Sequence, residues 1–139
     1  MTEHHVQADW KEGLAFDVKI GAHTITTDTV PEYGGTDSGP SPKRLLLAGL
    51  AGCTGMDVAS MLGKMRMPID SFRIDVEADQ TETYPKVYDR IRIRYIFTGA
   101  ELDRSKIEQA VKLSQEKYCG VSAMLEKAAD ISWEILLNP

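Results

Sequence analysis

The chain has 139 residues, of which 42% are apolar and 27% are charged, and its formal net charge is −5. These values are typical of one ordinary globular domain, so we predict a single domain over residues 1–139. Basic residues occur only in short pairs and the net charge is negative, which argues against binding to nucleic acid or to an anionic membrane surface.

The N-terminal segment bears on the cellular compartment of the protein. Its sequence, MTEHHVQADWKEG, is polar and lacks the apolar stretch of a signal peptide, so we expect a cytoplasmic protein. His4 and His5 are adjacent and therefore point to opposite sides of a strand. No neighbouring cysteine or carboxylate cluster completes a metal-binding pattern with them. We accordingly expect no metal and no cofactor.

Two predicted strands and a long loop come next. Apolar residues alternate with others over residues 14–20, which predicts a half-buried strand, and the Thr-rich residues 23–28 are expected to return beside it. Residues 29–41, TVPEYGGTDSGPS, form the only long turn-rich segment. Loops of this length are often functional. This loop either lies over a pocket beside the following helix or is an exposed connector.

Residues 42–67 are the central element of the predicted fold. Their sequence, PKRLLLAGLAGCTGMDVASMLGKMRM, is nearly all apolar from position 45 to position 62. Ser41 and Pro42 are typical of a helix start, and Pro68 is a natural stop. A helix that is apolar on most of its circumference should be buried. Asp57 interrupts the apolar run after about a dozen residues, which is fewer than the ~20 that a membrane span needs.

Small residues recur every three or four positions along this predicted helix, at Gly49, Gly52, Gly55, Ala59 and Gly63. Each glycine in a helix interior costs up to ~1 kcal/mol relative to alanine, so the row needs a compensating reason. We expect another backbone to approach closely there. The approaching element is either a second helix of this chain or the same helix of a partner subunit.

The second half of the chain predicts a hairpin, two helices and a closing strand. Residues 72–78 alternate apolar and mostly acidic side chains, and residues 87–97 alternate apolar and basic ones. Antiparallel pairing would set these opposite charges face to face, so we interpret the basic row as a solvated face, formed by Arg90, Arg92 and Arg94. Asp103 is a helix cap, and residues 131–137 alternate as a last strand. Strands and helices in separate blocks indicate an α+β fold with an antiparallel sheet.

The chain has two cysteines, Cys53 in the central helix and Cys119 at the expected N-terminus of a short helix. They do not make a disulfide scaffold, although a transient catalytic disulfide is allowed in a reducing compartment. A catalytic thiol must ionise, and because burial opposes this, it needs a cation, hydrogen-bond donors or a helix N-terminus nearby. Composition and spacing alone leave two interpretations open, buried structural thiols or a redox pair.

Three charged residues bear on the chemistry of Cys53. Asp57, one helical turn further on, would raise the pKa of the thiol if it were charged and close. Lys43 and Arg44 lie in the first helical turn, where positive charge is unfavourable against the helix dipole. Nine residues of helix rise ~14 Å, so these two cations are too far along the same helix to touch Cys53. They remain candidates to stabilise the thiolate of a neighbouring subunit.

The segments GPSPKRLLLAGLAGCTGMDV around Cys53 and EKYCGVSAMLEKAADI around Cys119 resemble the OsmC/Ohr family. These are the osmotically inducible and organic hydroperoxide resistance proteins. The resemblance implies an OsmC-like fold in an intertwined homodimer, with two long central helices packed across sheets and active sites at the subunit interface. It implies that Cys53 attacks a peroxide oxygen and becomes a sulfenic acid, and that Cys119 resolves it as a disulfide. A dithiol, often lipoyl-linked, then reduces the pair.

The sequence departs from the well-characterised peroxidases of that family at two places. Those proteins use an arginine from the N-terminal region and a glutamate early in the central helix, whereas no arginine precedes Arg44 here, and Lys43 and Arg44 stand where the glutamate is expected. Two hypotheses follow. The protein is a thiol-dependent peroxidase of organic hydroperoxides, acting in the response to oxidative stress, or it is a non-catalytic dimer that binds a small apolar or acyl ligand at the subunit interface.

Overall fold

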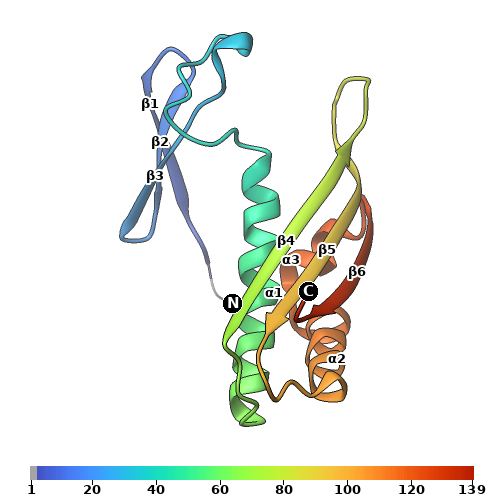
Figure 1. The fold of residues 1–139 in the computed structure, drawn as a ribbon. Coiled ribbons are helices and arrows are strands. Elements are labelled where there is room, and N and C mark those ends of the chain that lie inside the picture. Colours follow the sequence, from blue (N-terminus) through green and yellow to red (C-terminus); the bar gives the residue numbers. More distant parts are fainter. Residues whose placement is uncertain (1–2) are drawn as a thin grey trace. The chain divides into compact units, whose positions relative to one another are not determined.

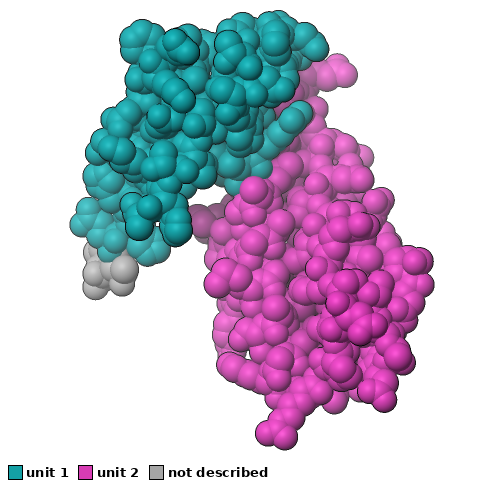
Figure 2. Space-filling model, turned by 60° about the vertical axis from the view of Figure 1, so that its left-hand side comes forward, with its two compact units in different colours: residues 1–46 teal, residues 47–139 magenta. Residues whose placement is uncertain are grey.

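The computed structural model describes residues 3–139, and the chain divides into two compact units, Met1–Leu46 and Leu47–Pro139, which Figure 2 colours separately. The first unit is a three-stranded antiparallel sheet in the order β1-β2-β3, followed by one short 3₁₀ helix. Its elements are β1 (Val6–Glu12), β2 (Ala15–Ile20), β3 (His23–Thr27) and η1 (Pro31–Tyr33).

Tight turns join the strands of this first sheet. Gly13 and Gly21 occupy the turns with φ of +57° and +60°, a backbone region that glycine enters without steric cost. The predicted pairing of residues 14–20 with 23–28 is confirmed, because β2 and β3 pair from Phe16–Thr27 to Ile20–His23. Apolar side chains of β2 nevertheless remain partly exposed, with Phe16 at 38% and Ile20 at 43%.

Asp28 organises the loop that follows β3. Its buried carboxylate accepts hydrogen bonds from the backbone and hydroxyl groups of Thr36 and Ser38 and from the backbone N–H of Thr29. These bonds, the Ser38 hydroxyl first among them, hold the pKa of Asp28 well below its usual range. The turn-rich segment is therefore a structured loop closed around one carboxylate. Whether it lies over a pocket stays a prediction.

The second unit contains a three-stranded sheet in the order β4-β5-β6 with helices behind it in the view of Figure 1. Its strands are β4 (Ser71–Gln80), β5 (Tyr88–Thr98) and β6 (Asp130–Leu137). Its helical segments are α1 (Arg44–Lys64), which starts at the end of the first unit, α2 (Arg104–Leu113), the π-helical turn η2 (Ser114–Tyr118) and α3 (Gly120–Leu125).

The α+β class is confirmed, but one strand pairing differs from the antiparallel sheet that we predicted. β4 and β5 form the expected antiparallel hairpin, whereas β6 runs parallel to β5. The reason is the connection between β5 and β6. The segments α2, η2 and α3 return the chain to the end of the sheet at which β5 begins, so β6 runs in the same direction as β5. An alternating strand pattern contains no information about its direction.

The charges of the hairpin pair across strands as predicted. Arg92 donates two hydrogen bonds to the Asp79 carboxylate at 3.0 and 3.1 Å. Arg94 contacts Glu77 at 3.4 Å and Glu134 at 3.1 Å. The arginine side chains are about two-fifths exposed, which agrees with their interpretation as a solvated face.

Helix α1 starts two residues later than the sequence indicated. The backbone N–H of Arg44 donates to the Ser41 carbonyl at 3.2 Å, a 3₁₀-type turn that leads into the α-helix. At the other end, Arg66 has a φ of +55° and terminates the helix just before Pro68. The predicted stop is thus confirmed to within a few residues.

Only one side of α1 is buried within the chain, which corrects our expectation of a helix buried on most of its circumference. Four of its residues are buried, namely Leu50, Thr54, Val58 and Leu62. The helix is long and apolar enough to cross a membrane by length and composition, yet its buried residues pack as part of the core with β5 and α2. An apolar pattern cannot tell whether the covering surface belongs to the same chain.

The glycines of the small-residue row have no close backbone partner among residues 3–139 outside α1 itself. A Cβ atom added at Gly55 would meet the side chain of Ile74 on β4 at 3.0 Å, so this glycine lets α1 approach the sheet. At Gly49, Gly52 and Gly63, an added Cβ would meet no atom of residues 3–139 within 4 Å other than its chain neighbours and the nearby backbone of α1 itself. Of our two explanations, a second helix of this chain is therefore not observed.

Candidate active site

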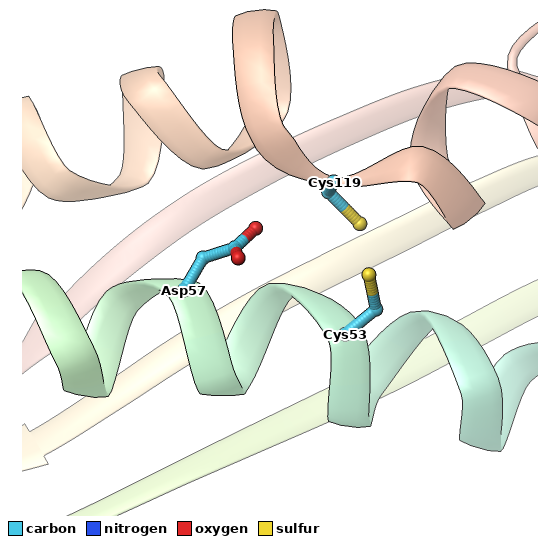
Figure 3. Close-up of side chains that lie close together, drawn as sticks. All are labelled: Cys53, Asp57 and Cys119. Carbon is cyan, nitrogen blue, oxygen red and sulfur yellow. The ribbon is translucent and has the colours of Figure 1, made fainter. Parts of the chain in front are cut away.

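The two cysteines, 66 positions apart in the sequence, meet in the second unit together with one carboxylate (Figure 3). Cys53 and Asp57 project from successive turns of α1 towards Cys119, which lies at the joint between η2 and α3. The two sulfurs and a carboxylate oxygen of Asp57 all lie within 4.8 Å of one another. Both cysteines are free thiols.

The local backbone explains how Cys119 reaches this position. Asp103 caps α2 as predicted, accepting hydrogen bonds from the backbone N–H groups of Ser105 and Lys106. The helix then widens into the π-helical turn η2, which the N–H of Cys119 closes by donating to the Ser114 carbonyl at 2.8 Å. Such π-turns are rare and frequently occur at functional sites.

Cys119 is itself the N-cap of α3, as we predicted. Its sulfur accepts a hydrogen bond from the backbone N–H of Ser122 at 3.3 Å. Even so, burial raises the pKa of the Cys119 thiol to about 11, and the neighbouring Cys53 and Asp57 act in the same direction. The single N–H donor lowers the pKa by less than burial raises it. Cys119 is therefore held as a neutral thiol.

The two thiols differ in accessibility. Cys119 is buried, with 3% of its surface exposed, whereas Cys53 is half-buried. A reagent that arrives from solvent therefore reaches the Cys53 sulfur more readily. This difference between two adjacent thiols is the main chemical asymmetry of the site.

A buried polar network lies beneath the thiols. The Thr54 hydroxyl forms hydrogen bonds of 2.7 Å with both the Tyr95 hydroxyl and the Ser114 hydroxyl. Ser114 in turn donates to Asp57 Oδ2 at 2.9 Å. Thr54, Tyr95 and Ser114 are fully buried, so each depends on these partners in place of water.

Gln115 extends the network to the Cys119 side of the site. Its side-chain amide donates to the Tyr95 hydroxyl at 2.9 Å and to the Thr54 hydroxyl at 3.2 Å. Its carbonyl oxygen accepts from the Ser122 hydroxyl at 2.7 Å, and the backbone of Ser122 bonds the Cys119 sulfur. One continuous set of hydrogen bonds thus joins α1, β5, η2 and α3 around the thiol pair.

Sequence reasoning missed the members of this network, namely Thr54, Tyr95, Ser114, Gln115 and Ser122. Ser114 falls on the same helical spacing as the apolar residues of α2, which made it look like an ordinary core position. The available signal was one polar residue on each of two otherwise apolar helix faces. These residues are Thr54 in the central helix and Ser114 at the end of the apolar face of α2. One such residue is too common in helices to indicate a site.

A cleft of about 620 Å³ adjoins the carboxylate side of the thiol cluster. Methionines and other apolar side chains form much of its wall, together with Asp57 and Lys64. The lining residues are Met56, Asp57, Ser60, Met61, Lys64, Met65, Leu113 and Tyr118. The cleft gives the site contact with solvent on the side of Asp57.

The two predicted cations are not part of the thiol cluster. Lys43 precedes α1 and Arg44 is its first residue. The nine residues from Arg44 to Cys53 rise ~14 Å along the helix, as expected from the sequence. The role of Lys43 and Arg44 as thiolate-stabilising cations stays a prediction.

Comparison with known proteins adds the family. A family model described as OsmC-like protein matches residues 35–134. The chain belongs to the OsmC-like family. This confirms the resemblance that the segments around Cys53 and Cys119 indicated.

Relatives with similar sequences cover nearly the whole chain. Protein YhfA of Escherichia coli is 33% identical over 129 residues, which are 91% of this chain and 94% of that protein. A crystal structure of a hypothetical protein from Aquifex aeolicus is 33% identical, covers 100% of both chains and has a TM-score of 0.84. The Aquifex aeolicus structure shares the fold of this chain along its whole length.

One solved structure with lower sequence identity has a name that states a function. The organic hydroperoxide resistance protein OhrB of Bacillus subtilis is similar with a TM-score of 0.64 over 96% of this chain and 98% of that one. At 19% sequence identity this likeness concerns the fold alone.

Proposed function

We propose that this protein is a thiol-dependent peroxidase that reduces organic hydroperoxides, with Cys53 as nucleophile and Cys119 as resolving thiol. One observation carries the proposal: a half-buried thiol and a buried thiol lie within 4.8 Å of each other at a π-helical turn. The name of the similar OhrB protein supports the same chemistry.

The reaction proceeds in two balanced steps. The Cys53 thiolate attacks the terminal oxygen of the hydroperoxide, so the O–O bond breaks, Cys53 becomes a sulfenic acid and the alcohol leaves after taking up a proton. The Cys119 thiol then attacks the Cys53 sulfur and forms the disulfide, and its proton leaves with the hydroxyl group as water. Cys53 and Cys119 together lose two electrons and the peroxide gains them.

The unequal burial of the two thiols suits these roles. The accessible sulfur of Cys53 meets the substrate, while buried Cys119 with its raised pKa stays neutral and does not compete for peroxide. The sulfurs need to approach from at most 4.8 Å to the ~2.05 Å of a disulfide bond. A dithiol, lipoyl-linked in the family's usual pattern, then reduces the disulfide in the cytoplasm, where thiols stay reduced.

The proposed active form is a homodimer. Outside the nearby residues of α1 itself, no atom of residues 3–139 lies within 4 Å of a Cβ added at Gly49, Gly52 or Gly63, and Met56 on the same helix is 75% exposed. A second copy of α1 packed against this apolar surface would bury it and bring Lys43 or Arg44 of one subunit within reach of the other subunit's thiols. That arrangement would supply the cation that each thiol cluster needs.

Mass spectrometry tests the peroxidase proposal directly. Reduced protein treated with tert-butyl hydroperoxide should lose two hydrogens per chain and yield a peptide pair joined through Cys53 and Cys119. The Cys53→Ser variant should consume no peroxide. A wild-type protein that keeps both thiols reduced in excess hydroperoxide would overturn the proposal.

A second function is favoured by the cleft beside Asp57 and by the absence of the family's N-terminal arginine and helix-start glutamate. In it, a non-catalytic homodimer holds a small apolar or acyl ligand at the subunit interface, with the methionine-lined cleft of about 620 Å³ as part of the pocket, and the thiols take no part. Native mass spectrometry would then detect a retained ligand, and Cys53→Ser would leave its binding nearly intact.

A further inference from the structure

The thiol cluster contains one donor that the peroxidase steps do not use, the Asp57 carboxylate. We propose that Cys53, Asp57 and Cys119 of the reduced protein form a binding site for a thiophilic divalent cation, with Zn²⁺ as the cation that fits the donors best. The juxtaposition is confined to the second unit and combines residues of one helix with the joint of two others. It does not depend on peroxidase activity.

The donor set matches the coordination chemistry of zinc. Two cysteine sulfurs and one carboxylate oxygen are ligand types that Zn²⁺ takes up, whereas Mg²⁺ and Ca²⁺ select oxygen donors alone. Three protein ligands with a fourth position left to water is the usual arrangement of a catalytic zinc site. The cleft that Asp57 lines provides solvent for that fourth position and a path of entry.

The distances are close to those that a metal would impose. A tetrahedral zinc ion with sulfur at ~2.3 Å and oxygen at ~2.1 Å separates its ligand atoms by about 3.5–3.8 Å. The three donor atoms here lie within 4.8 Å of one another. Shifts on the order of 1 Å, within the reach of side-chain rotation, would close the site around a metal.

The backbone geometry favours chelation by two elements. Cys53 and Asp57 are four residues apart on α1, so they face the same side on successive turns, as Figure 3 shows. Cys119 approaches from the opposite side on a segment whose position is defined by the buried network. A metal between them would therefore join α1 to the η2–α3 joint.

Two of the three donors already have the outer hydrogen bonds that orient metal ligands. Ser114 donates its hydroxyl to Asp57 Oδ2 at 2.9 Å, and the Ser122 N–H donates to the Cys119 sulfur at 3.3 Å. Such outer partners typically contribute about 10–100-fold to metal affinity. They restrict the donor atoms before any metal arrives.

Metal binding and disulfide formation exclude each other at this site. Binding replaces the two thiol protons, so one Zn²⁺ enters and two protons leave. A two-electron oxidant of the hydroperoxide class converts the same two sulfurs into a disulfide and is itself reduced to alcohol and water. Oxidation thereby removes two of the three ligands and releases the ion. Bound Zn²⁺ would protect the two reduced thiols from oxidation, and their oxidation by peroxide would release the Zn²⁺.

Cobalt titration tests the site without relying on turnover. Co²⁺ added to the fully reduced protein should bind one ion per chain and give sulfur-to-cobalt charge-transfer absorption, which Zn²⁺ should abolish by displacement and Mg²⁺ should not. Cys53→Ser and Cys119→Ser should each weaken binding by at least about 100-fold, and Asp57→Asn by at least about 10-fold. Glu116→Gln, which changes an exposed carboxylate on the adjacent turn, is the matched control and should bind as the wild type does.

A second experiment uses the wild-type protein alone, so its result does not depend on whether a variant folds. Oxidation to the disulfide should remove the absorption and release a stoichiometric amount of Zn²⁺ to a chromogenic chelator, and a dithiol should restore binding. Reduced protein without thiolate-to-cobalt absorption would overturn the proposal, as would equal losses in Asp57→Asn and Glu116→Gln. Failure of the peroxidase proposal can be distinguished from failure of the metal site. In that case the protein would not consume peroxide, while the cobalt titration would still show binding.

Discussion

Ser114 donates a hydrogen bond of 2.9 Å to the Asp57 carboxylate, and this bond connects the π-helical turn to the helix that bears Cys53. Because Ser114 also bonds the Thr54 hydroxyl at 2.7 Å, one buried hydroxyl links the charged part of the site to its neutral network. Ser114 is fully buried, so water cannot replace it. The geometry of the thiol site therefore depends on a residue that carries no chemistry of its own.

The Ser114→Ala variant tests this dependence. Removing the hydroxyl breaks the buried hydrogen bonds of Ser114 to Asp57 and to Thr54, although Thr54 keeps its bonds to Tyr95 and Gln115, so the free energy of unfolding should fall by about 1–3 kcal/mol. Chemical denaturation monitored by circular dichroism measures it. Ser60→Ala, at an exposed position of the same helix, is the control and should change stability by less than about 0.5 kcal/mol. Equal effects of the two substitutions would contradict the proposed dependence.

The Cys119→Ser variant should separate the two steps of the proposed peroxidase reaction. Cys53 remains accessible in it, so one equivalent of hydroperoxide should still be consumed, and the Cys53 sulfenic acid should then persist because its resolving thiol is gone. A sulfenic-acid reagent such as dimedone should label Cys53 more strongly than in the wild type. If Cys119→Ser shows no more labelling than Cys53→Ser, Cys53 is not the nucleophile.

The carboxylate of Asp28 predicts a stability change in acid. Its folded-state pKa lies below the value of about 3.9 for the unfolded chain, because hydrogen bonds from Ser38, Thr29 and Thr36 favour the charged form. The resulting stability is present above about pH 4 and is lost as the pH falls further, since the unfolded chain then binds the proton more tightly. Melting temperatures measured from neutral to acidic pH should decline more steeply for the wild type than for Asp28→Asn.

Asp37→Asn is the matched control for that experiment. Asp37 lies in the same loop, is exposed and has a φ of +54°, a conformation that asparagine also tolerates. This variant should keep the acid dependence of the wild type. The same pH profile in Asp28→Asn and Asp37→Asn would contradict the assigned role of Asp28.

Leu62 tests the core that supports the site. It is fully buried on α1, so Leu62→Ala should lower the free energy of unfolding by about 2–5 kcal/mol through lost contacts and a residual cavity. Met124→Ala on α3, where the side chain is 67% exposed, should cost less than about 1 kcal/mol. Urea titrations of the two variants give the comparison, and similar midpoints would show that α1 is not buried at Leu62.

The exposed surface of α1 predicts self-association. If a second copy covers it, the wild type should elute at the mass of a dimer in size-exclusion chromatography with light scattering. Met56→Lys should shift it towards the monomer, because a charge would be buried at the seam. Met124→Lys, a similar change at an exposed methionine on another helix, should leave the mass unchanged. A wild type that is monomeric at high concentration would contradict the dimer.

Local signals in the sequence predicted the elements well. Asp103 as a cap and Pro68 as a stop are each confirmed, because a cap and a missing N–H act within a few residues. The facing charges of Arg92 and Asp79 were predictable for a similar reason, since pairing of adjacent strands follows from their patterns.

Long-range relationships were not accessible in the same way. Nothing in the pattern of residues 131–137 encodes a direction, so the parallel pairing of β6 with β5 became visible only in the fold. The exposed side of α1 is as apolar as its buried side, so hydropathy could not distinguish the two. Thr54 and Ser114, 60 positions apart, carry no mark of their contact.

By itself, the sequence determined most of the strands and helices and their order, the family, and the identity of the two thiols, because periodicity, capping and motif spacing are local properties of the chain. Only the tertiary structure decided that a half-buried Cys53 meets a buried Cys119 beside Asp57, within 4.8 Å. Burial and hydrogen bonding between distant segments set the accessibility of each sulfur and the pKa of Cys119. Those quantities separate the roles of two otherwise identical side chains.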